Sequence, residues 1–174
     1  MVFHFHFRGL QERKDLQQLI NFLLLQNLGY PNYDDWVQRT KSELDRGYKS
    51  VILAFSGRQL VGDLIYQPHK EVSCFLELKN LRVHPTIRER KFAEFMLRQA
   101  EAENKNKYDA IICDIPVSRP KIVRFMESQG YETSRTIPLY NPNRGDVVML
   151  KFLNESSRRL LLLVANKIVL QKAI

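Results

Sequence analysis

The fold of this chain is decided by the stretch ELKNLRVHPTIRERKFA, residues 77–93, in which a strand leads through a loop into a helix. The segment 72–83 is a long apolar and alternating run, which predicts a strand. Pro85 ends it, because proline cannot donate a hydrogen bond to a strand ladder. A helix is expected over 86–104, where an apolar stripe at helical spacing is formed by Ala93, Met96, Leu97 and Ala100.

The loop between this strand and this helix concentrates positive charge. The start of a helix offers unpaired backbone N–H groups and the positive end of the helix dipole, which together bind anions. Arg88, Arg90 and Lys91 add three positive charges beside it, and Glu89 offsets one of them. On charge grounds the segment fits a pyrophosphate.

The same reasoning extends outward along the chain in both directions. Period-two alternation and short apolar runs predict strands over 2–8, 50–55, 60–66, 72–83, 108–113, 131–137 and 146–152. Apolar stripes and turn residues predict helices over 12–27, 32–46, 86–104 and 119–128, the last capped by Ser118. This order predicts one α/β or α+β sheet with helices on its faces.

The composition is that of an ordinary globular protein. The chain has 174 residues, 44% of them hydrophobic and 26% charged, which excludes disordered and collagen-like chains. Cys74 and Cys113 lie in apolar runs, which argues against a disulfide scaffold and against a cysteine zinc site. We therefore expect a protein of the reducing cytoplasm that binds no metal. The longest apolar run, 160–165, is far shorter than the about 20 residues of a membrane span, so no span is expected.

The net charge of +8 is distributed unevenly. Residues 1–87 carry 11 basic and 9 acidic groups, a net +2, and residues 88–174 carry 16 and 10, a net +6. We therefore expect an anionic partner at the second half, with a solvated basic surface as the alternative. The basic groups are spread over several elements without a recognised nucleic-acid motif, so a nucleic acid is not the expected partner.

The stretch 77–93, taken with the element order, resembles the GCN5-related N-acetyltransferase (GNAT) family. In that family a loop of the form [Arg/Gln]-x-x-Gly-x-[Gly/Ala] cradles the pyrophosphate of acetyl-CoA. Residues 88–93 occupy this loop, in which Arg88 and Ala93 match and Lys91 stands at the glycine position. Two further segments, 57–62 and 118–131, resemble other GNAT signatures.

The resemblance implies a GNAT-like domain over residues 1–153. Its fold would be a mixed, mostly antiparallel sheet of about seven strands flanked by about four helices. Residues 154–174 would form an extra C-terminal helix that packs on the domain or on a second subunit as a homodimer. A basic amphipathic helix on a membrane surface is the third reading of this tail.

The resemblance also implies the residues that bind acetyl-CoA. The backbone of Leu81 and Val83 would pair with the pantetheine amides. The pyrophosphate loop and the second signature would supply the remaining contacts, from Arg88, Arg90, Lys91, Phe92, Ala93 and Arg119.

Glu77 is the first candidate for the catalytic base. The family reaction needs a group that takes a proton from an ammonium before the amine attacks the thioester, and a carboxylate on the central strand serves this role. The alternative is that Glu77 pairs with Lys79 or Arg82 at the sheet surface.

The acceptor amine is the least constrained part of the expectation. The first two helices form the acceptor wall in the resembled family, so Tyr30, Tyr33 and Trp36 are the candidate substrate-binding residues. Aromatic residues in such positions also commonly belong to the core. The acceptor class stays open between a small amine, an antibiotic and a protein amine.

Three functions follow from these observations. The first is an acetyl-CoA-dependent N-acetyltransferase. The second is a GNAT-fold protein that binds acyl-CoA or a macromolecular partner without turnover, because Lys91, Arg119 and Met126 replace the usual glycine, asparagine and proton-donating tyrosine. The third is a nucleic-acid-binding α/β protein.

Overall fold

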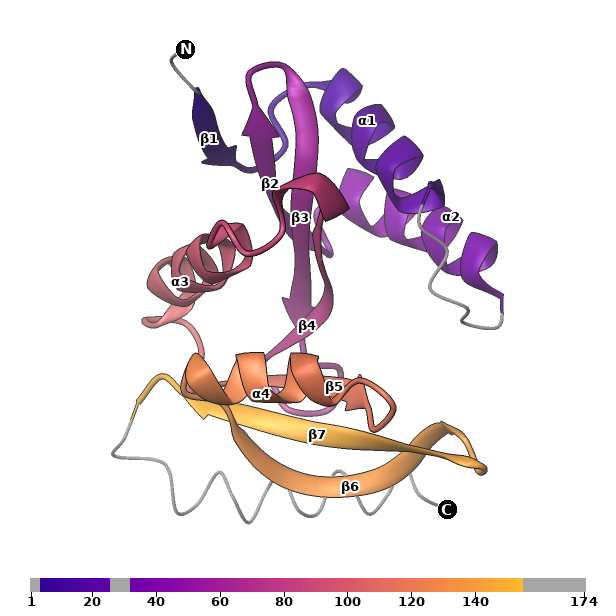
Figure 1. The fold of residues 1–174 in the computed structure, drawn as a ribbon, viewed down its shortest axis with the longest axis vertical. Coiled ribbons are helices and arrows are strands. Elements are labelled where there is room, and N and C mark those ends of the chain that lie inside the picture. The colour runs from indigo at the N-terminus through magenta and orange to yellow at the C-terminus, as the bar shows by residue number, and fades with distance from the viewer. Residues whose placement is uncertain (1–3, 26–31, 155–174) are drawn as a thin grey trace. The chain divides into compact units, whose positions relative to one another are not determined.

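The structure is a computed structural model that describes residues 4–25 and 32–154. Seven strands form one sheet in the order β1-β2-β3-β4-β5-β7-β6 (Figure 1). The pairs β1–β2, β2–β3, β5–β7 and β6–β7 are antiparallel, and β4 pairs with β5 in parallel. The prediction of a mixed, mostly antiparallel seven-stranded sheet with four α-helices is confirmed for the described residues.

The elements follow the predicted order. The strands are β1 (Phe5–Arg8), β2 (Ser50–Ser56), β3 (Gln59–Pro68), β4 (Phe75–Val83), β5 (Ala110–Pro116), β6 (Glu132–Asn141) and β7 (Arg144–Phe152). The α-helices are α1 (Arg13–Leu24), α2 (Tyr33–Asp45), α3 (Phe92–Asn104) and α4 (Pro120–Ser128), and a short 3₁₀ helix, η1, covers Pro85–Ile87. The predicted helix in the tail lies outside the described residues, and the division at residues 153 and 154 stays a prediction.

Two predicted helix starts were wrong. The helix expected from Thr86 begins only at Phe92, because η1 and an irregular loop of residues 88–91 come first. Glu89 and Lys91 in this loop have φ angles of 67° and 62°, which an α-helix cannot contain. Helix α4 begins at Pro120 with Arg119, not Ser118, at its N-cap.

The phenylalanine side chains of β1 are only partly covered. Phe5 of β1 is 38% exposed, although its ring meets the ring of Phe92 edge-on at 4.9 Å between centroids. Phe7 contacts Phe92 and Phe95 with centroids 5.5 and 5.7 Å apart. Strand β1 pairs with β2 at the end of the strand order, and an edge position leaves side chains less enclosed than a central one.

The chain forms two compact units. Unit 1 comprises residues 1–67 and 79–102, and unit 2 comprises residues 68–78 and 103–174. The boundary falls within β4, so its first half belongs to unit 2 and its second half to unit 1.

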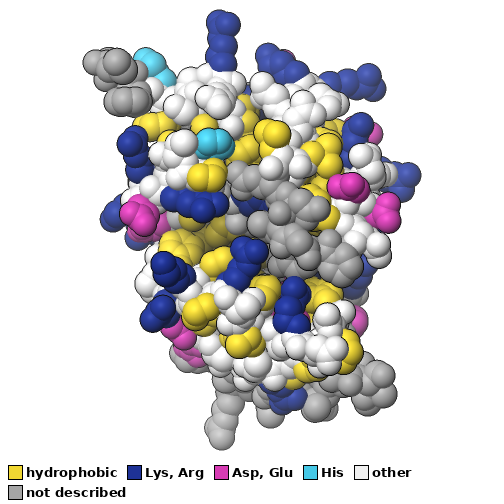
Figure 2. Space-filling view, turned by 45° about the vertical axis from the view of Figure 1, so that its right-hand side comes forward, with side chains coloured by type: hydrophobic (Ala, Val, Ile, Leu, Met, Phe, Trp, Pro, Cys, Tyr) yellow, Lys and Arg dark blue, Asp and Glu magenta, His cyan; other side chains and the backbone are white. Residues whose placement is uncertain are grey.

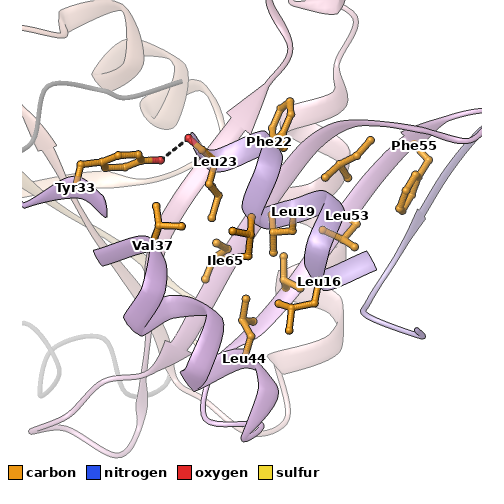
Figure 3. Packing of buried hydrophobic residues seen from close by; sticks show 13 residues of the cluster. Leu16, Leu19, Phe22, Leu23, Tyr33, Val37, Leu44, Leu53, Phe55 and Ile65 are labelled. Carbon is orange, nitrogen blue, oxygen red and sulfur yellow. Dashed lines mark hydrogen bonds between the residues drawn. The ribbon is translucent and has the colours of Figure 1, made fainter. Parts of the chain in front are cut away.

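The core of unit 1 lies between helices α1 and α2 and strands β2 and β3 (Figure 3). Leu16, Leu19, Ile20 and Leu23 recur at helical spacing on α1, and all four are buried. They meet the alternate residues Val51, Leu53 and Phe55 of β2 and Ile65 of β3. The apolar stripe that predicted α1 therefore places that helix on the sheet.

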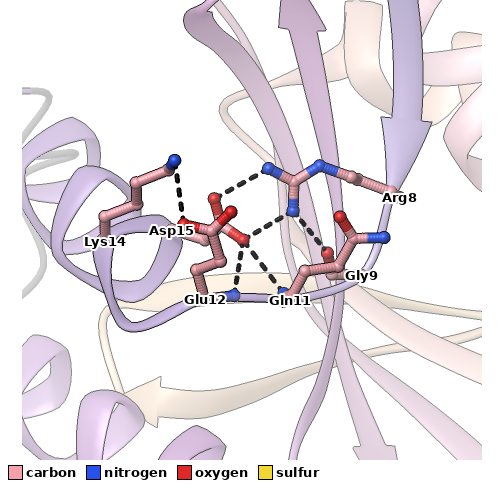
Figure 4. A network of polar contacts seen from close by, with 6 residues as sticks. All are labelled: Arg8, Gly9, Gln11, Glu12, Lys14 and Asp15. Carbon is pink, nitrogen blue, oxygen red and sulfur yellow. Dashed lines mark hydrogen bonds and ion pairs between the residues drawn. The ribbon is translucent and has the colours of Figure 1, made fainter.

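A polar contact joins β1 to the start of α1 (Figure 4). Arg8 donates two hydrogen bonds to Asp15, with N–O distances of 2.5 and 2.8 Å. The Asp15 carboxylate also accepts the backbone N–H groups of Gln11 and Glu12. The bond from Arg8 lowers the pKa of Asp15 most strongly, and no surface of Asp15 is exposed. This pair anchors the first turn of α1 to the sheet edge.

The core of unit 2 forms on one face of β4, β5 and β7. Its buried members are Phe75, Ala110, Ile112, Val148 and Leu150. Strand β4 pairs with β5 over Phe75–Glu77, so Glu77 stands at the end of this pairing, opposite Ile112. Among the described residues, no helix has both the length and the apolar character needed to cross a membrane.

Candidate active site

The loop of residues 88–91 has an unusual backbone. Glu89 and Lys91 adopt left-handed φ angles, and Arg90 between them does not. Residues that alternate between right- and left-handed conformations turn their N–H groups toward one point, which forms a concave anion site. Left-handed backbone at a residue other than glycine is strained, and such strain clusters at functional sites. Lys91 stands at the family's glycine position and has a φ angle that glycine adopts without steric cost.

The loop is held at both ends within unit 1. The backbone N–H of His84 donates to Val61 on β3 over 2.7 Å, and Arg88 Nε donates to the carbonyl of Val83 over 3.4 Å. On the other side, Phe92 is 4% exposed and packs on Phe5 and Phe7. The side chain of Phe92 is therefore used in packing, and only its backbone faces the loop.

The side chains of the loop are open to solvent. Arg88, Arg90 and Lys91 are exposed, and Ala93 is partly buried. Three exposed basic residues thus lie in the irregular segment that leads directly into α3. An anion with several oxygens, such as a pyrophosphate, fits this donor set in number and in charge.

Leu81 and Val83 lie on the second half of β4, in unit 1, and both are partly buried. They come after the β4–β5 pairing of Phe75–Glu77. Their expected hydrogen bonds to the pantetheine amides stay a prediction.

Glu77 lies in unit 2 and is 9% exposed. The alternative prediction was that Glu77 pairs with Arg82. In the structure, the guanidinium of Arg82 contacts Asn80, Tyr33 and the carbonyl of Leu23, all of which lie in unit 1. Glu77 is close enough to Tyr140 on β6 to raise the pKa of its phenol.

Tyr140 is a residue of this region that was not among the predicted site residues, because its spacing in the sequence could not place it in the site. Its hydroxyl donates to Asp114 Oδ1 over 3.1 Å. Burial of the phenol raises the pKa of Tyr140 most, and the carboxylates of Asp114, Glu77 and Asp146 raise it further. A phenol with a raised pKa gives up its proton poorly, so Tyr140 is suited to holding Asp114 in place and not to acting as an acid.

The aromatic residues predicted for the acceptor differ in their placement. Tyr33 is 4% exposed and belongs to the core of unit 1, where its hydroxyl donates to the carbonyl of Leu23 over 2.8 Å (Figure 3). Trp36 is partly buried, stacks on Tyr33 and lies beneath the ammonium of Lys49. Tyr30 lies outside the described residues.

A buried polar network continues from Tyr33 to the sheet. Arg82 Nη2 donates to the hydroxyl of Tyr33 over 2.5 Å, and Arg82 Nε donates to Asn80 Oδ1 over 3.0 Å. Asn80 Nδ2 donates to Asp63 Oδ2 on β3. Asp63, which we did not predict as a site residue, is the single charged residue in the apolar run 60–66, and that isolation is the signal that could have identified it.

Solved structures share this architecture. A protein described as a GNAT-family acetyltransferase from Desulfovibrio desulfuricans superposes with a TM-score of 0.76 at 13% identity, over 86% of this chain and 99% of that one. The ribosomal-protein-S18-alanine N-acetyltransferase of Escherichia coli gives 0.71 at 15% identity, over 87% and 95% of the two chains. An aminoglycoside 6'-N-acetyltransferase complexed with coenzyme A gives 0.69 at 16% identity, over 85% and 97%. This chain has the GNAT fold.

The likeness is one of structure and not of sequence. No protein-family profile matches the chain, and no curated protein matches it in sequence. At 13–16% identity, the comparison establishes the GNAT fold and leaves the activity to be argued from the residues.

The segment 118–131, which resembles the second GNAT signature, lies in unit 2. Arg119 is partly buried at the N-cap of α4, and its N–H donates to the carbonyl of Pro116 over 2.8 Å. Met126 is 3% exposed, so the position at which the GNAT family carries its tyrosine belongs here to the packed side of α4. Methionine has no proton to give, and α4 therefore supplies none from this position.

The predicted GNAT site residues divide between the two units. Unit 1 holds the predicted pyrophosphate loop, the second half of β4 and, among the described residues, the predicted acceptor residues Tyr33 and Trp36. Unit 2 holds Glu77 and Arg119. Within the described ranges, no group of three or more His, Cys, Asp or Glu side chains is arranged to hold a metal ion.

Proposed function

We propose that this chain is an N-acetyltransferase that transfers the acetyl group of acetyl-CoA to a primary amine. The observation that carries this proposal is the loop of residues 88–91, which has left-handed backbone at Glu89 and Lys91. This loop lies directly before α3 in a chain with the GNAT fold. The coenzyme A bound by an aminoglycoside acetyltransferase of the same fold supports an acyl-CoA as the ligand.

The loop would hold the pyrophosphate through backbone N–H groups, with Arg88 and Arg90 adding charge-assisted hydrogen bonds. Lys91 does not close the loop by its conformation, because its φ angle of 62° reproduces the backbone path open to glycine. Figure 2 shows Lys and Arg side chains exposed at several places on the surface.

The chemistry assigned to Glu77 is proton removal. The ammonium of the acceptor loses one proton to the carboxylate, and the nitrogen lone pair then forms a bond to the acetyl carbonyl carbon. The carbon–sulfur bond breaks and the thiolate of CoA leaves. The nitrogen loses its second proton as the amide forms, the thiolate takes up one proton, and Glu77 releases the other to solvent. Glu77 is suited to this role because it is a carboxylate on β4 that is only 9% exposed, so little water competes with the acceptor amine for it.

A second candidate function is binding of acyl-CoA without turnover. The buried Met126 favours it, because α4 then has no proton donor at the position that the family uses. The two functions share the cofactor loop and differ in whether the thioester is consumed.

The first experiment is calorimetric titration of the protein with acetyl-CoA, with CoA in parallel. We expect saturable binding near one ligand per chain. Arg88→Ala should weaken acetyl-CoA about tenfold or more, since a charged hydrogen bond contributes roughly 1.5–3 kcal/mol. Arg58→Ala is the matched control, because Arg58 is an equally exposed arginine on the turn between β2 and β3.

Turnover is then measured as release of free CoA thiol over a panel of primary amines. The proposal requires acetylation of at least one amine and a large loss of kcat in Glu77→Gln. Acetyl-CoA binding without thiol release on any amine would select the second function. Absence of acetyl-CoA binding at millimolar ligand would refute both.

A further inference from the structure

The carboxylate of Asp63 has an open position in the core of unit 1. Its Oδ2 accepts a hydrogen bond from Asn80, whereas its Oδ1 has no hydrogen-bond partner among residues 4–25 and 32–154. No surface of Asp63 is exposed to solvent. Asp63 pairs with Leu53 across the β2–β3 ladder, and Leu53 and Ile65 on the same face belong to the apolar core. A buried carboxylate oxygen without a donor is costly, because it has lost water and gained no replacement.

The neighbouring polar groups show what kind of ligand is missing. Arg82 donates to Asn80, to Tyr33 and, over 3.2 Å, to the carbonyl of Leu23. Tyr33 itself donates to that same carbonyl. The open atom in this network is an acceptor, so the missing group is a hydrogen-bond donor and an anion is excluded.

The charge balance selects a cationic donor. Arg82 and Asn80 lower the pKa of Asp63, yet burial outweighs both and raises it to about 6. The negative charge is therefore incompletely compensated by the groups that surround it. A positively charged donor relieves this deficit, and an ion pair formed away from water is stronger than the same pair at the surface.

We propose that Asp63 Oδ1 is a binding position for a protonated primary amine, and that this amine is a second amino group of the acetyl acceptor, not the one that loses its proton to Glu77. That the amine belongs to the acetyl acceptor rests on the proposed function. That Asp63 binds an ammonium group does not. An alkylammonium group fits because it is slender, carries three donors and keeps its charge at neutral pH. Asp63 has no exposed surface, so the amine reaches it through a local opening of unit 1, and association is slow for that reason.

The first test follows the carboxyl carbon of Asp63 by ¹³C NMR as the pH is varied. The probe is n-butylamine, and 1-butanol is the uncharged ligand of similar shape. We expect n-butylamine to lower the pKa of Asp63 saturably and 1-butanol to leave it unchanged. Spermidine and a lysine-containing peptide, each of which carries more than one amino group, then distinguish a small polyamine from a protein as the source of the ammonium group.

The second test compares kinetics of two variants. Asp63→Asn keeps the shape of the side chain and removes its charge, and we expect KM for the amine to rise at least tenfold with acetyl-CoA affinity unchanged. Asp35→Asn removes the same charge from an exposed residue of α2 and should leave KM for the amine within twofold of wild type.

The outcomes separate this inference from the proposed function. A pKa of Asp63 that saturating n-butylamine does not move, or that 1-butanol moves equally, overturns the inference even when acetyl-CoA binds and is turned over. A wild-type protein that fails to bind acetyl-CoA but whose Asp63 pKa still falls with n-butylamine overturns the proposed function and supports the amine site.

Discussion

Replacement of Lys91 by glycine is expected to stabilise this protein. Lys91 has a φ angle of 62°, and a left-handed conformation costs a residue with a Cβ roughly 1–2 kcal/mol. Glycine removes this strain, but it also adds about 0.5–1 kcal/mol of chain entropy that folding must overcome. The net expectation for Lys91→Gly is a gain of about 0.5–1 kcal/mol, which is a rise of roughly 1–4 °C in Tm for a chain of this length.

Lys91→Ala is the control that isolates the backbone. It removes the same ammonium group and keeps the Cβ, so it keeps the strain. Thermal unfolding should place the glycine variant above both the alanine variant and wild type. Because both variants lose the same charge, their affinities for acetyl-CoA in calorimetry should agree within about twofold.

The reasoning is refuted if Lys91→Gly unfolds at a lower temperature than Lys91→Ala. Glycine behaves in that way at positions with ordinary helical backbone, where it is less stable than alanine by roughly 1 kcal/mol. That result would mean that residue 91 is the first part of a regular helix, and the concave loop on which the cofactor proposal depends would be lost with it.

Three further predictions concern stability. A Cβ on Gly62 would lie 2.9 Å from the carbonyl oxygen of Arg82, so Gly62→Ala should lower the free energy of unfolding in urea by about 1–3 kcal/mol, and an unchanged midpoint would contradict this close approach. Hydrogen bonds from Arg8 lower the pKa of Asp15, so the ionised pair stabilises the fold above about pH 4 and its contribution is lost as the pH falls further. Asp15→Asn should therefore be about 2 kcal/mol less stable than wild type at pH 7, with a gap that narrows below pH 4 in parallel urea titrations. Burial raises the pKa of Asp63 to about 6, so in the absence of amine wild-type stability should fall as the pH rises from about 4 to 6. Asp63→Asn should then be the more stable protein above pH 6, and equal stability at pH 8 would show that this carboxylate is well compensated.

The local sequence was sufficient to predict the helices and strands and the position of the basic loop of residues 88–91. Helix α1 was predictable because Leu16, Leu19, Ile20 and Leu23 repeat with the period of a helix. The sequence also placed the basic loop 88–91 directly before an amphipathic helix. These features depend on neighbours a few residues apart, which is the range over which periodicity and charge patterns carry information.

The conformation of that loop was not predictable in the same way. The sequence suggested a helix from Thr86, whereas Glu89 and Lys91 adopt left-handed backbone that neither residue prefers by itself. Such a conformation persists when contacts on both sides hold it, here His84 on Val61 before the loop and Phe92 on Phe5 after it. Those partners come from other strands and are known only from the folded chain.

Asp63 shows the same limit for the candidate amine site. Its isolation in an apolar strand was visible in the sequence, but its partners were not. Asn80 is 17 residues from Asp63, and Arg82 lies 49 residues from Tyr33 and 59 from Leu23. The sequence by itself determined the order of the elements and the basic segment that opens α3. Only tertiary structure decided which polar groups meet in the core and which oxygen is left without a donor, because side chains so far apart in the chain become neighbours only after the sheet register and the packing of α1 and α2 are set.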